Sequence, residues 1–389
     1  MILQYISMLA LVLLIPTLVL YLCKKYNGPT ILYLLLAALV SNRVVSLIGI
    51  EIPQLLGKVL ITVAIAILLF EIYSRVKIKE HDFFYSHVLR AHLILLVICS
   101  FVIAFVIHKL FAFQNFFYSL IPAVLFAGTS YILFETQERK WFVTKLNSFL
   151  ETEAILSTAL SLAVALIFSA FAVSITIGKN NAVLYVPFMV YFVKVIVGIG
   201  TGIVIGLIVS KYFSNLLKSR YLFLFLLAVI ICTYLFAEAL QGSGILATIV
   251  MSLFFGNIYL KHKEEHQKFS SIYNNLLYIF IFLFISFYTT MPFELIFYGK
   301  ALIVFLAYLL VRFIVLALFL PADYTMKNKI VLTFIMPKEM EILIVGFFLL
   351  LTQASAAFLA INSLIVTVTL YSIVVSLIAM RFSKFHAKA

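Results

Sequence analysis

A small set of charged side chains lies inside long apolar stretches of this sequence. The set comprises Glu153, Lys194, Glu238, Lys300, Arg312, Lys338, Glu339 and Glu341. A charge at the centre of a membrane span costs at least about 2.5–3.5 kcal/mol, so such groups are expected to have partners or a task in moving ions or protons. At 1.5 Å per residue, Lys338, Arg312 and Glu153 are expected roughly 13, 12 and 8 Å inside their stretches. These three side chains are therefore expected to share one half of a membrane.

Hydroxyl groups and helix-breaking residues occur at similar depths. Four hydroxyl side chains belong to this group: Thr129, Ser130, Ser157 and Thr158. The fifth apolar stretch also contains Pro122 and Gly128, and the twelfth contains Pro337 directly before Lys338. Interrupted helices in corresponding halves of a membrane protein are a sequence pointer to a transport site. We therefore expect the fifth and twelfth helices to be broken and to cross near these side chains.

The elements that would position these residues are membrane-spanning helices. Of 389 residues, 65% are hydrophobic and only 11% are charged, whereas soluble proteins contain about 25% charged residues. This composition excludes a soluble enzyme, a disordered chain and a secreted disulfide scaffold. A span needs about 20 apolar residues. The sequence predicts thirteen such spans, at residues 2–23, 29–47, 53–74, 88–108, 116–135, 148–172, 183–210, 221–239, 242–259, 272–289, 294–320, 329–351 and 358–380.

The basic residues predict the orientation of these spans. When the loops are assigned alternately to the two sides, one side holds 20 Lys and Arg residues and the other holds 3. Because cytoplasmic loops carry the excess of basic residues, the N-terminus is expected outside and the C-terminus in the cytoplasm. The net charge of +13 is then explained by membrane topology, and no nucleic-acid partner is expected.

Other kinds of site are not expected. Cys23, Cys99 and Cys232 are far apart in the sequence, so no zinc-type spacing exists. The chain also has no phosphate-binding loop pattern, which argues against transport driven by ATP, and we expect no cofactor. Five histidines are expected as solvated residues in or near cytoplasmic loops: His81, His87, His92, His262 and His266.

Six short motifs follow one another along the chain. They are Leu69-Phe70-Glu71, Ala127-Gly128-Thr129-Ser130, Leu150-Glu151-Thr152-Glu153-Ala154-Ile155-Leu156-Ser157-Thr158, Ala237-Glu238-Ala239-Leu240-Gln241-Gly242-Ser243-Gly244-Ile245-Leu246-Ala247, Arg312-Phe313 and Met336-Pro337-Lys338. In this order they resemble segments of the monovalent cation:proton antiporter superfamily, in its sodium/hydrogen exchanger branch. The resemblance covers nearly the whole chain. It implies one transmembrane domain with an inverted repeat, the first repeat at about 2–172, a linker helix at about 183–210 and the second repeat at about 221–380.

The sequence departs from this family where the ion is bound. Ser130 stands where the family has an Asp after Thr, and Ser157 and Thr158 stand where it has Asn-Asp. The Asp of that second pair is the family's carrier of protons and cations. Glu153 and Arg312 do match the family's pattern, and the resemblance therefore implies a buried ion pair between them.

Exchange of a cation for a proton at one site requires a titratable group. Hydroxyl oxygens are good ligands of hard cations, so the four hydroxyl groups could complete a cation shell, but they do not exchange protons near pH 7. Four carboxylates could replace the missing aspartate: Glu151, Glu153, Glu339 and Glu341. Arg312 is expected to hold Glu153 ionised. Lys338 is expected to balance Glu339 or Glu341, or to neutralise the dipoles of broken helix ends.

We therefore expect an all-α polytopic membrane protein of about 13 transmembrane helices, a transporter and not an enzyme. The expected function is exchange of a monovalent cation (Na⁺, K⁺ or Li⁺) for protons in a cell membrane. One alternative is a protein of this fold without antiport activity, such as a sensor or a partner-dependent membrane component. The other is a transporter of another solute or of an anion, and Arg312 and Lys338 would be the basic groups of an anion site. The resemblance also implies a homodimer.

Overall fold

A computed structural model describes residues 14–23, 25, 30–48, 53–74, 84–128, 144–177, 185–212, 222–258, 263–321, 324–335, 338, 340–353 and 355–387. The regular elements in these ranges are all α-helices. The predicted all-helical fold class is therefore confirmed.

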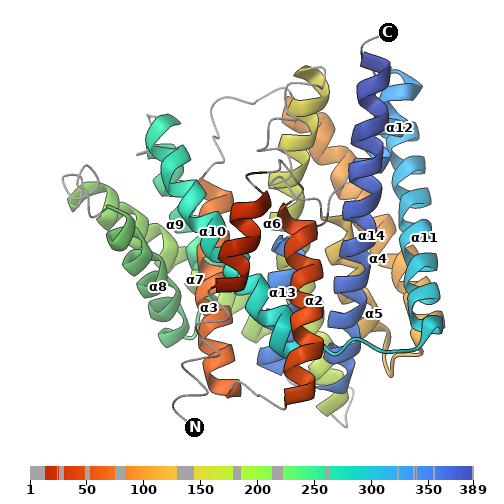
Figure 1. The fold of residues 1–389 in the computed structure, drawn as a ribbon. Coiled ribbons are helices and arrows are strands. Elements are labelled where there is room, and N and C mark those ends of the chain that lie inside the picture. The colour runs from red at the N-terminus through yellow and green to blue at the C-terminus, as the bar shows by residue number, and fades with distance from the viewer. Residues whose placement is uncertain are drawn as a thin grey trace. The chain divides into compact units, whose positions relative to one another are not determined.

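Helices lie at all of the predicted spans (Figure 1). A helix covers Leu14–Cys23. It is followed by α2 (Thr30–Ile48), α3 (Gln54–Ser74), α4 (Phe84–Phe111), α5 (Phe116–Ala127), α6 (Thr144–Ile177), α7 (Tyr185–Tyr212), α8 (Leu222–Ala239), α9 (Gly244–Ile258), α10 (Lys263–Tyr288), α11 (Leu295–Phe319), α12 (Met326–Phe334), α13 (Met340–Gln353) and α14 (Ala356–Ala387). The twelfth predicted span thus contains two helices, α12 and α13, separated at the predicted break.

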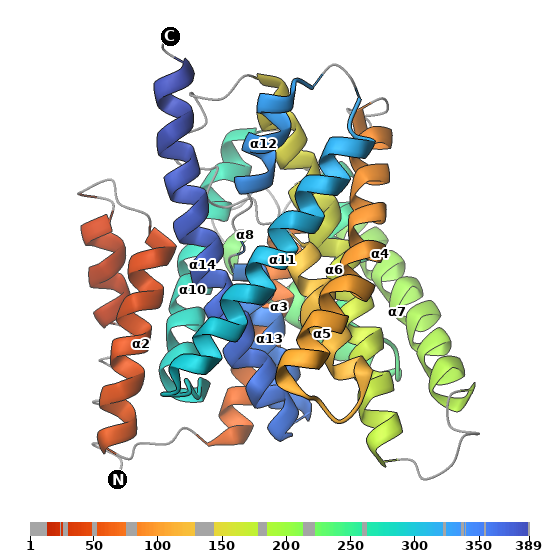
Figure 2. The ribbon, with the colours of Figure 1, turned by 90° about the vertical axis from the view of Figure 1, so that its right-hand side faces the viewer.

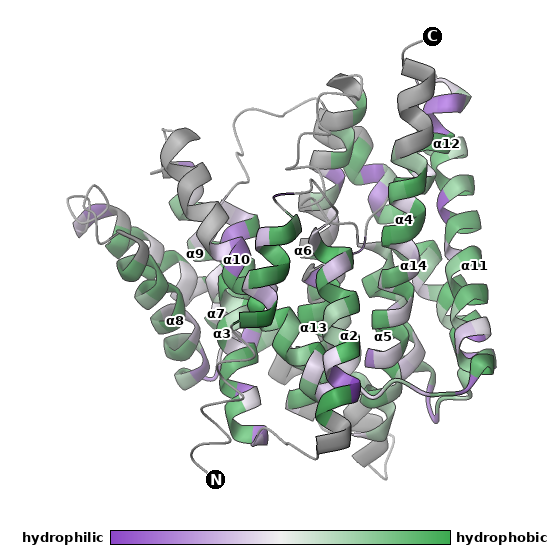
Figure 3. Ribbon diagram, in the orientation of Figure 1, coloured by the Kyte–Doolittle hydropathy of each residue, from purple (hydrophilic) through white to green (hydrophobic). Residues whose placement is uncertain are grey.

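Composition explains why these segments are helical. In a bilayer, a backbone that forms all its hydrogen bonds within one segment avoids unsatisfied polar groups. Figure 3 shows that apolar residues dominate α4, α11 and α14, whereas α12 is more polar. Among the described residues, five helices are both long and apolar enough to cross a membrane: Gln54–Ser74, Val88–Phe111, Phe192–Val209, Leu295–Phe319 and Ala356–Met380. The total of thirteen crossings stays a prediction.

Local capping fixes several helix ends. The side chain of Asn115 accepts a hydrogen bond from the Tyr118 N–H at the start of α5, and that of Thr325 accepts one from Asn328 at the start of α12. Such caps satisfy backbone donors that have no partner within the helix. At the end of α11, Lys329 Nζ donates to the carbonyl oxygens of Ala317 and Leu320, at 2.9 and 3.1 Å.

The chain forms two compact units. The first contains residues 1–54, 83–173 and 281–389, and the second contains residues 55–82 and 174–280. In the first unit, α4 packs against α5 and α11, and α14 packs against α11, α12 and α13 (Figures 1 and 2). This packing surrounds the charged residues of α6 and α11 with apolar helices.

The second unit is built on close packing between α7 and α9. Gly198, Gly202 and Gly206 recur every four residues on α7 and face α9. A Cβ atom at Gly202 would lie 2.5 Å from the Ala247 carbonyl oxygen, and one at Gly198 would lie 2.7 Å from that of Ser243. Small residues at this spacing let helix backbones approach closely in membranes.

The predicted spans 221–239 and 242–259 are separated by only two residues. The structure ends α8 at Ala239 and begins α9 at Gly244, which confirms the boundary. Gln241 adopts a positive φ of 59° within this turn, and the Glu238 carboxylate accepts a hydrogen bond from the Gly244 N–H at 2.9 Å. Glu238, one of the charges found inside apolar stretches, therefore caps a helix.

Candidate functional site

The first unit contains a buried ion pair. Glu153 lies on α6 and is 2% exposed, and Arg312 lies on α11 and is 0% exposed. Arg312 Nη1 donates to Glu153 Oε1 and Nη2 donates to Oε2, each at 2.7 Å. Two parallel bonds of this kind are the strongest geometry that a guanidinium and a carboxylate can adopt. The structure thus brings together the two residues for which the resemblance implies a pair.

Arg312 also ties this pair to two further groups. Its Nε donates to the Leu332 carbonyl oxygen in α12, and its Nη1 donates to the Tyr308 hydroxyl, both at 3.3 Å. Because a guanidinium has five donors and no acceptor, most of its donors are satisfied by these contacts. Arg312 is fully buried and therefore joins α11 to α6 and α12 inside the first unit.

Lys338 is the second buried cation. It lies between α12 and α13, is 0% exposed, and its Nζ donates to the carbonyl oxygens of Phe126 and Gly128, the latter at 2.6 Å. Both carbonyls belong to the C-terminal end of α5, where the helix dipole favours a positive charge. Of the roles expected for Lys338, the geometry supports neutralisation of a helix end.

Tyr308 connects the two cations, and sequence reasoning missed it. Its hydroxyl accepts from Arg312, and the Lys338 ammonium lies 4.1 Å from the centre of its ring. An aromatic ring attracts a cation placed over its face. Tyr308 precedes Arg312 by four residues, so it lies on the same face of α11. That spacing was the available signal.

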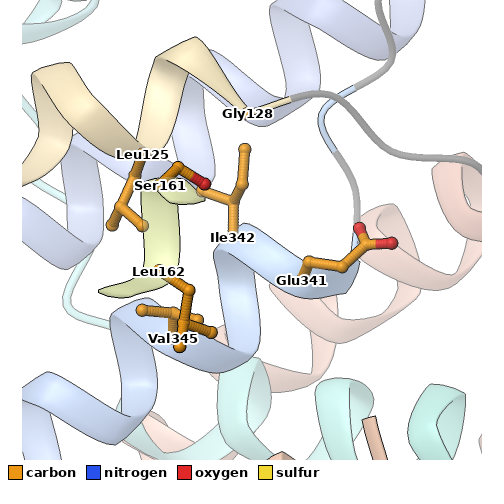
Figure 4. A pocket seen from close by; sticks show the side chains of 7 residues that line it. All are labelled: Leu125, Gly128, Ser161, Leu162, Glu341, Ile342 and Val345. Atoms are coloured by element: carbon orange, nitrogen blue, oxygen red, sulfur yellow. The ribbon is translucent and has the colours of Figure 1, made fainter. Parts of the chain in front are cut away.

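Gly128, whose carbonyl oxygen accepts from Lys338, also lines a small pocket. Figure 4 shows the residues that line this pocket. Its lining residues come from the end of α5, from α6 and from the start of α13: Leu125, Gly128, Ser161, Leu162, Glu341, Ile342 and Val345. The volume of this pocket is about 10 Å³, which is close to the smallest space that holds one water molecule. The polar side chains of the lining are the Ser161 hydroxyl and the Glu341 carboxylate.

Close approach of α5 and α6 shapes the pocket. A Cβ atom at Gly128 would lie 2.9 Å from Ser161 Oγ. Ser157, the residue predicted from the sequence, lies one helical turn before Ser161 and is also buried; its hydroxyl donates to the Ala154 carbonyl oxygen at 3.2 Å. The serine that lines the pocket is therefore one turn further along α6 than the predicted one.

Several predicted site residues cannot be placed in this description. Thr129, Ser130 and Glu339 lie outside the described residues, as does Pro337 at the predicted break. Thr158 lies within α6, but its side chain is outside the described part of the structure, and the same holds for Glu151. Their roles remain predictions.

The prediction for His92 was wrong. The residue does not lie in a solvated loop: it belongs to α4 and is 2% exposed. The predicted fourth span began only four residues earlier, at residue 88, but α4 begins at Phe84, so His92 lies more than two turns inside the helix. Glu153, Arg312 and Lys338 all act on its ring electrostatically, and neither ring nitrogen has a hydrogen-bond partner among the described residues.

Comparisons with known proteins identify this architecture. The sequence profile described as "Sodium/hydrogen exchanger, transmembrane" matches residues 9–382. A search of curated proteins found no match. The fold is similar to the sodium proton antiporter MjNhaP1 from Methanocaldococcus jannaschii at pH 8, with a TM-score of 0.71 and 17% identity over 99% of this chain and 98% of that one.

A second structure of MjNhaP1 gives the same result. Its TM-score is 0.63 at 16% identity, over 97% of this chain and 95% of the other. At such low identity these structures establish the fold alone, whereas the profile match covers almost the entire chain. The chain is a multi-pass membrane protein that belongs to the sodium/hydrogen exchanger family.

Proposed function

We propose that the protein is a secondary transporter that exchanges a monovalent cation, Na⁺, K⁺ or Li⁺, for protons. Family membership supports this proposal. The observation that carries it is the small pocket at the junction of α5, α6 and α13, which combines a hydroxyl, a carboxylate and a nearby helix end. Hydroxyl, carboxylate and carbonyl oxygens are the ligands that hard cations prefer.

Each part of the cluster has a task in this proposal. The pair of Glu153 and Arg312 holds α6, α11 and α12 in a fixed arrangement. Lys338 stabilises the end of α5 beside the pocket. Ser161 takes the place in the pocket lining that the sequence assigned to Ser157, and the predicted ligands Thr129, Ser130, Thr158 and Glu339 would complete the cation shell.

The two basic residues do not favour an anion as the substrate. Arg312 places both of its terminal nitrogens on Glu153, and the Lys338 ammonium rests on two carbonyls and an aromatic face. An anion would have to displace these contacts inside an apolar environment. The alternative of anion transport is therefore the weaker candidate.

The proposal includes the remaining predictions on topology and assembly. The protein would lie in a cell membrane with its N-terminus outside and its C-terminus in the cytoplasm, in accordance with the distribution of basic residues. The chain would contain two inverted repeats, at about 2–172 and 221–380, joined by a linker helix at about 183–210, and two copies would form a dimer.

Purified protein in proteoliposomes tests the exchange directly. A pH gradient is imposed, an internal dye reports pH, and NaCl, LiCl or KCl is added in turn. Cation-dependent collapse of the gradient is expected for at least one of the three salts. Choline chloride and vesicles without protein are the controls. If folded protein leaves the gradient unchanged with all three cations, the exchange function is wrong.

A further inference from the structure

We infer that the transported cation binds to the carbonyl oxygens of Phe126 and Gly128 at the end of α5, and that the Lys338 ammonium occupies this place when no cation is bound. The inference rests on the proposed function and adds two cation ligands and an internal competitor. These ligands belong to the backbone, so they do not depend on the aspartates that the sequence lacks.

The end of α5 presents backbone oxygens that suit a cation. The helix ends at Ala127, and the last four carbonyl groups of an α-helix have no N–H partner within it. Phe126 is 0% exposed, and Gly128 is buried as well. The partial negative charge at this end of a helix favours a positive charge. In transporters with broken helices, carbonyl oxygens at such helix ends coordinate sodium ions.

The Lys338 ammonium already places a single positive charge at this position. An ammonium has three donors and no acceptor. It donates to the carbonyl oxygens of Phe126 and Gly128, the latter at 2.6 Å, and its Nζ lies 4.1 Å from the centre of the Tyr308 ring. These three contacts are with uncharged groups, and Lys338 is fully buried. An alkali cation carries the same charge and is also coordinated by backbone carbonyl oxygens.

The small pocket adjoins this position. Gly128 and Ser161 both line the pocket. A Cβ atom at Gly128 would lie 2.9 Å from Ser161 Oγ, and Figure 4 shows Gly128 where the helical ribbon of α5 ends. The pocket and the carbonyl ligands therefore meet at Gly128.

The ammonium and a cation exclude each other, because both require the same two oxygens. Two positive charges at one pair of carbonyls in an apolar environment would repel each other strongly. Arg312 does not fill the vacated place, since Glu153 holds both of its terminal nitrogens at 2.7 Å. The Lys338 side chain must therefore withdraw when the cation binds. Because Lys338 lies between α12 and α13, cation binding at α5 is coupled to the interruption of the twelfth span.

Variants of Lys338 test whether its ammonium competes with the cation. The proteins are wild type, Lys338→Met, Lys338→Gln and the matched control Lys329→Met, whose lysine also donates to two carbonyl oxygens at a helix end. Cation binding is measured as the rise in melting temperature with increasing NaCl, LiCl or KCl, since a ligand that binds only the folded state stabilises it. Exchange is measured in proteoliposomes.

We expect Lys338→Met to bind the cation more tightly than wild type and to exchange it more slowly. An ammonium that occupies the site about nine tenths of the time weakens the apparent affinity for the cation about tenfold, so its removal should lower the half-maximal cation concentration by at least about this factor. Lys338→Gln also loses the charge but keeps donors for the carbonyls, so it should tighten binding less. Lys329→Met should match wild type in binding. A purely structural role of Lys338 would slow exchange without tighter binding.

Anomalous diffraction from Rb⁺ locates the bound ion. In crystals of Lys338→Met soaked in RbCl, the peak should lie within coordination distance of the carbonyl oxygens of Phe126 and Gly128. In wild type the same peak should require a higher RbCl concentration and a withdrawn Lys338 side chain. A peak in contact with neither oxygen would overturn the site. If Lys338→Met does not fold, the soaks of wild type and Lys338→Gln decide by the same criterion.

The outcomes separate the site from the exchange function. Exchange by wild type, with equal half-maximal cation concentrations for wild type and Lys338→Met, would overturn the site and leave the exchange function intact. Equal tightening in Lys338→Met and Lys338→Gln would assign the effect to the lost charge and overturn the competition for the carbonyls. Tighter binding in Lys338→Met, without exchange by wild type, would support the site and overturn the exchange function. Absence of exchange and of cation binding in wild type would overturn both.

Discussion

Replacement of Glu153 by Gln should destabilise the protein strongly, because it leaves Arg312 as an unpaired charge in an apolar environment. Glu153 accepts two charged hydrogen bonds of 2.7 Å, and both partners are almost fully buried. Removal of one partner of such a pair costs about 3–5 kcal/mol. The remaining contacts of Arg312, both at 3.3 Å, are too long to compensate for the loss.

A double-mutant cycle measures this interaction. The proteins are wild type, Glu153→Gln, Arg312→Gln and the double variant, unfolded by denaturant in mixed micelles. Because the double variant has no unpaired charge, it should recover part of the lost stability. The expected coupling energy between Glu153 and Arg312 is about 2–3 kcal/mol, toward the upper end of the values that contacting residues show. A coupling below about 0.5 kcal/mol, as for an exposed surface pair, would refute the reasoning.

Three further variants test other parts of the structure. Gly202→Ala should destabilise the second unit by about 1–3 kcal/mol through overpacking. Gly200→Ala should not, because no atom lies within 4 Å of the new Cβ. Equal unfolding midpoints for the two variants would contradict the packing argument. Lys338→Met should reduce the exchange rate at least about tenfold, because the carbonyl oxygens beside the pocket lose their hydrogen-bond donor. Lys329→Met removes a lysine at another helix end and should lower stability more than exchange. Comparable exchange rates for the two variants would contradict the role of Lys338 at the end of α5. His92→Asn should leave the pH profile of exchange unchanged, because the ring is buried and neither of its nitrogens has a hydrogen-bond partner among the described residues. A shifted profile would show that His92 takes part in proton transfer.

The positions of the helices could be predicted from the sequence alone. Residues 53–74 and 221–239 were expected as spans, and the structure has helices at Gln54–Ser74 and Leu222–Ala239. Such agreement follows from the physics of the bilayer, in which each segment must satisfy its own backbone and be apolar over its length. The break between α12 and α13 was predicted from Pro337 for a similarly local reason.

The arrangement of the site could be predicted only in part. The role of Lys338 depends on the backbone carbonyls of Phe126 and Gly128, and a carbonyl has no sequence signature because every residue carries one. The depth of His92 was missed because α4 begins four residues before the predicted span. Hydropathy marks the length of a helix but not which of its faces meets the charged residues, and for this reason Ser161 was not distinguished from Ser157.

Uptake of radioactive cation into proteoliposomes under an imposed pH gradient tests the central claim most directly. With the interior more acidic than the medium, outward movement of protons should drive the cation inward above its external concentration. The accumulated cation should leave again when an ionophore dissipates the pH gradient. The proposal is contradicted if the cation merely equilibrates, at a rate and to a level that do not depend on the pH difference.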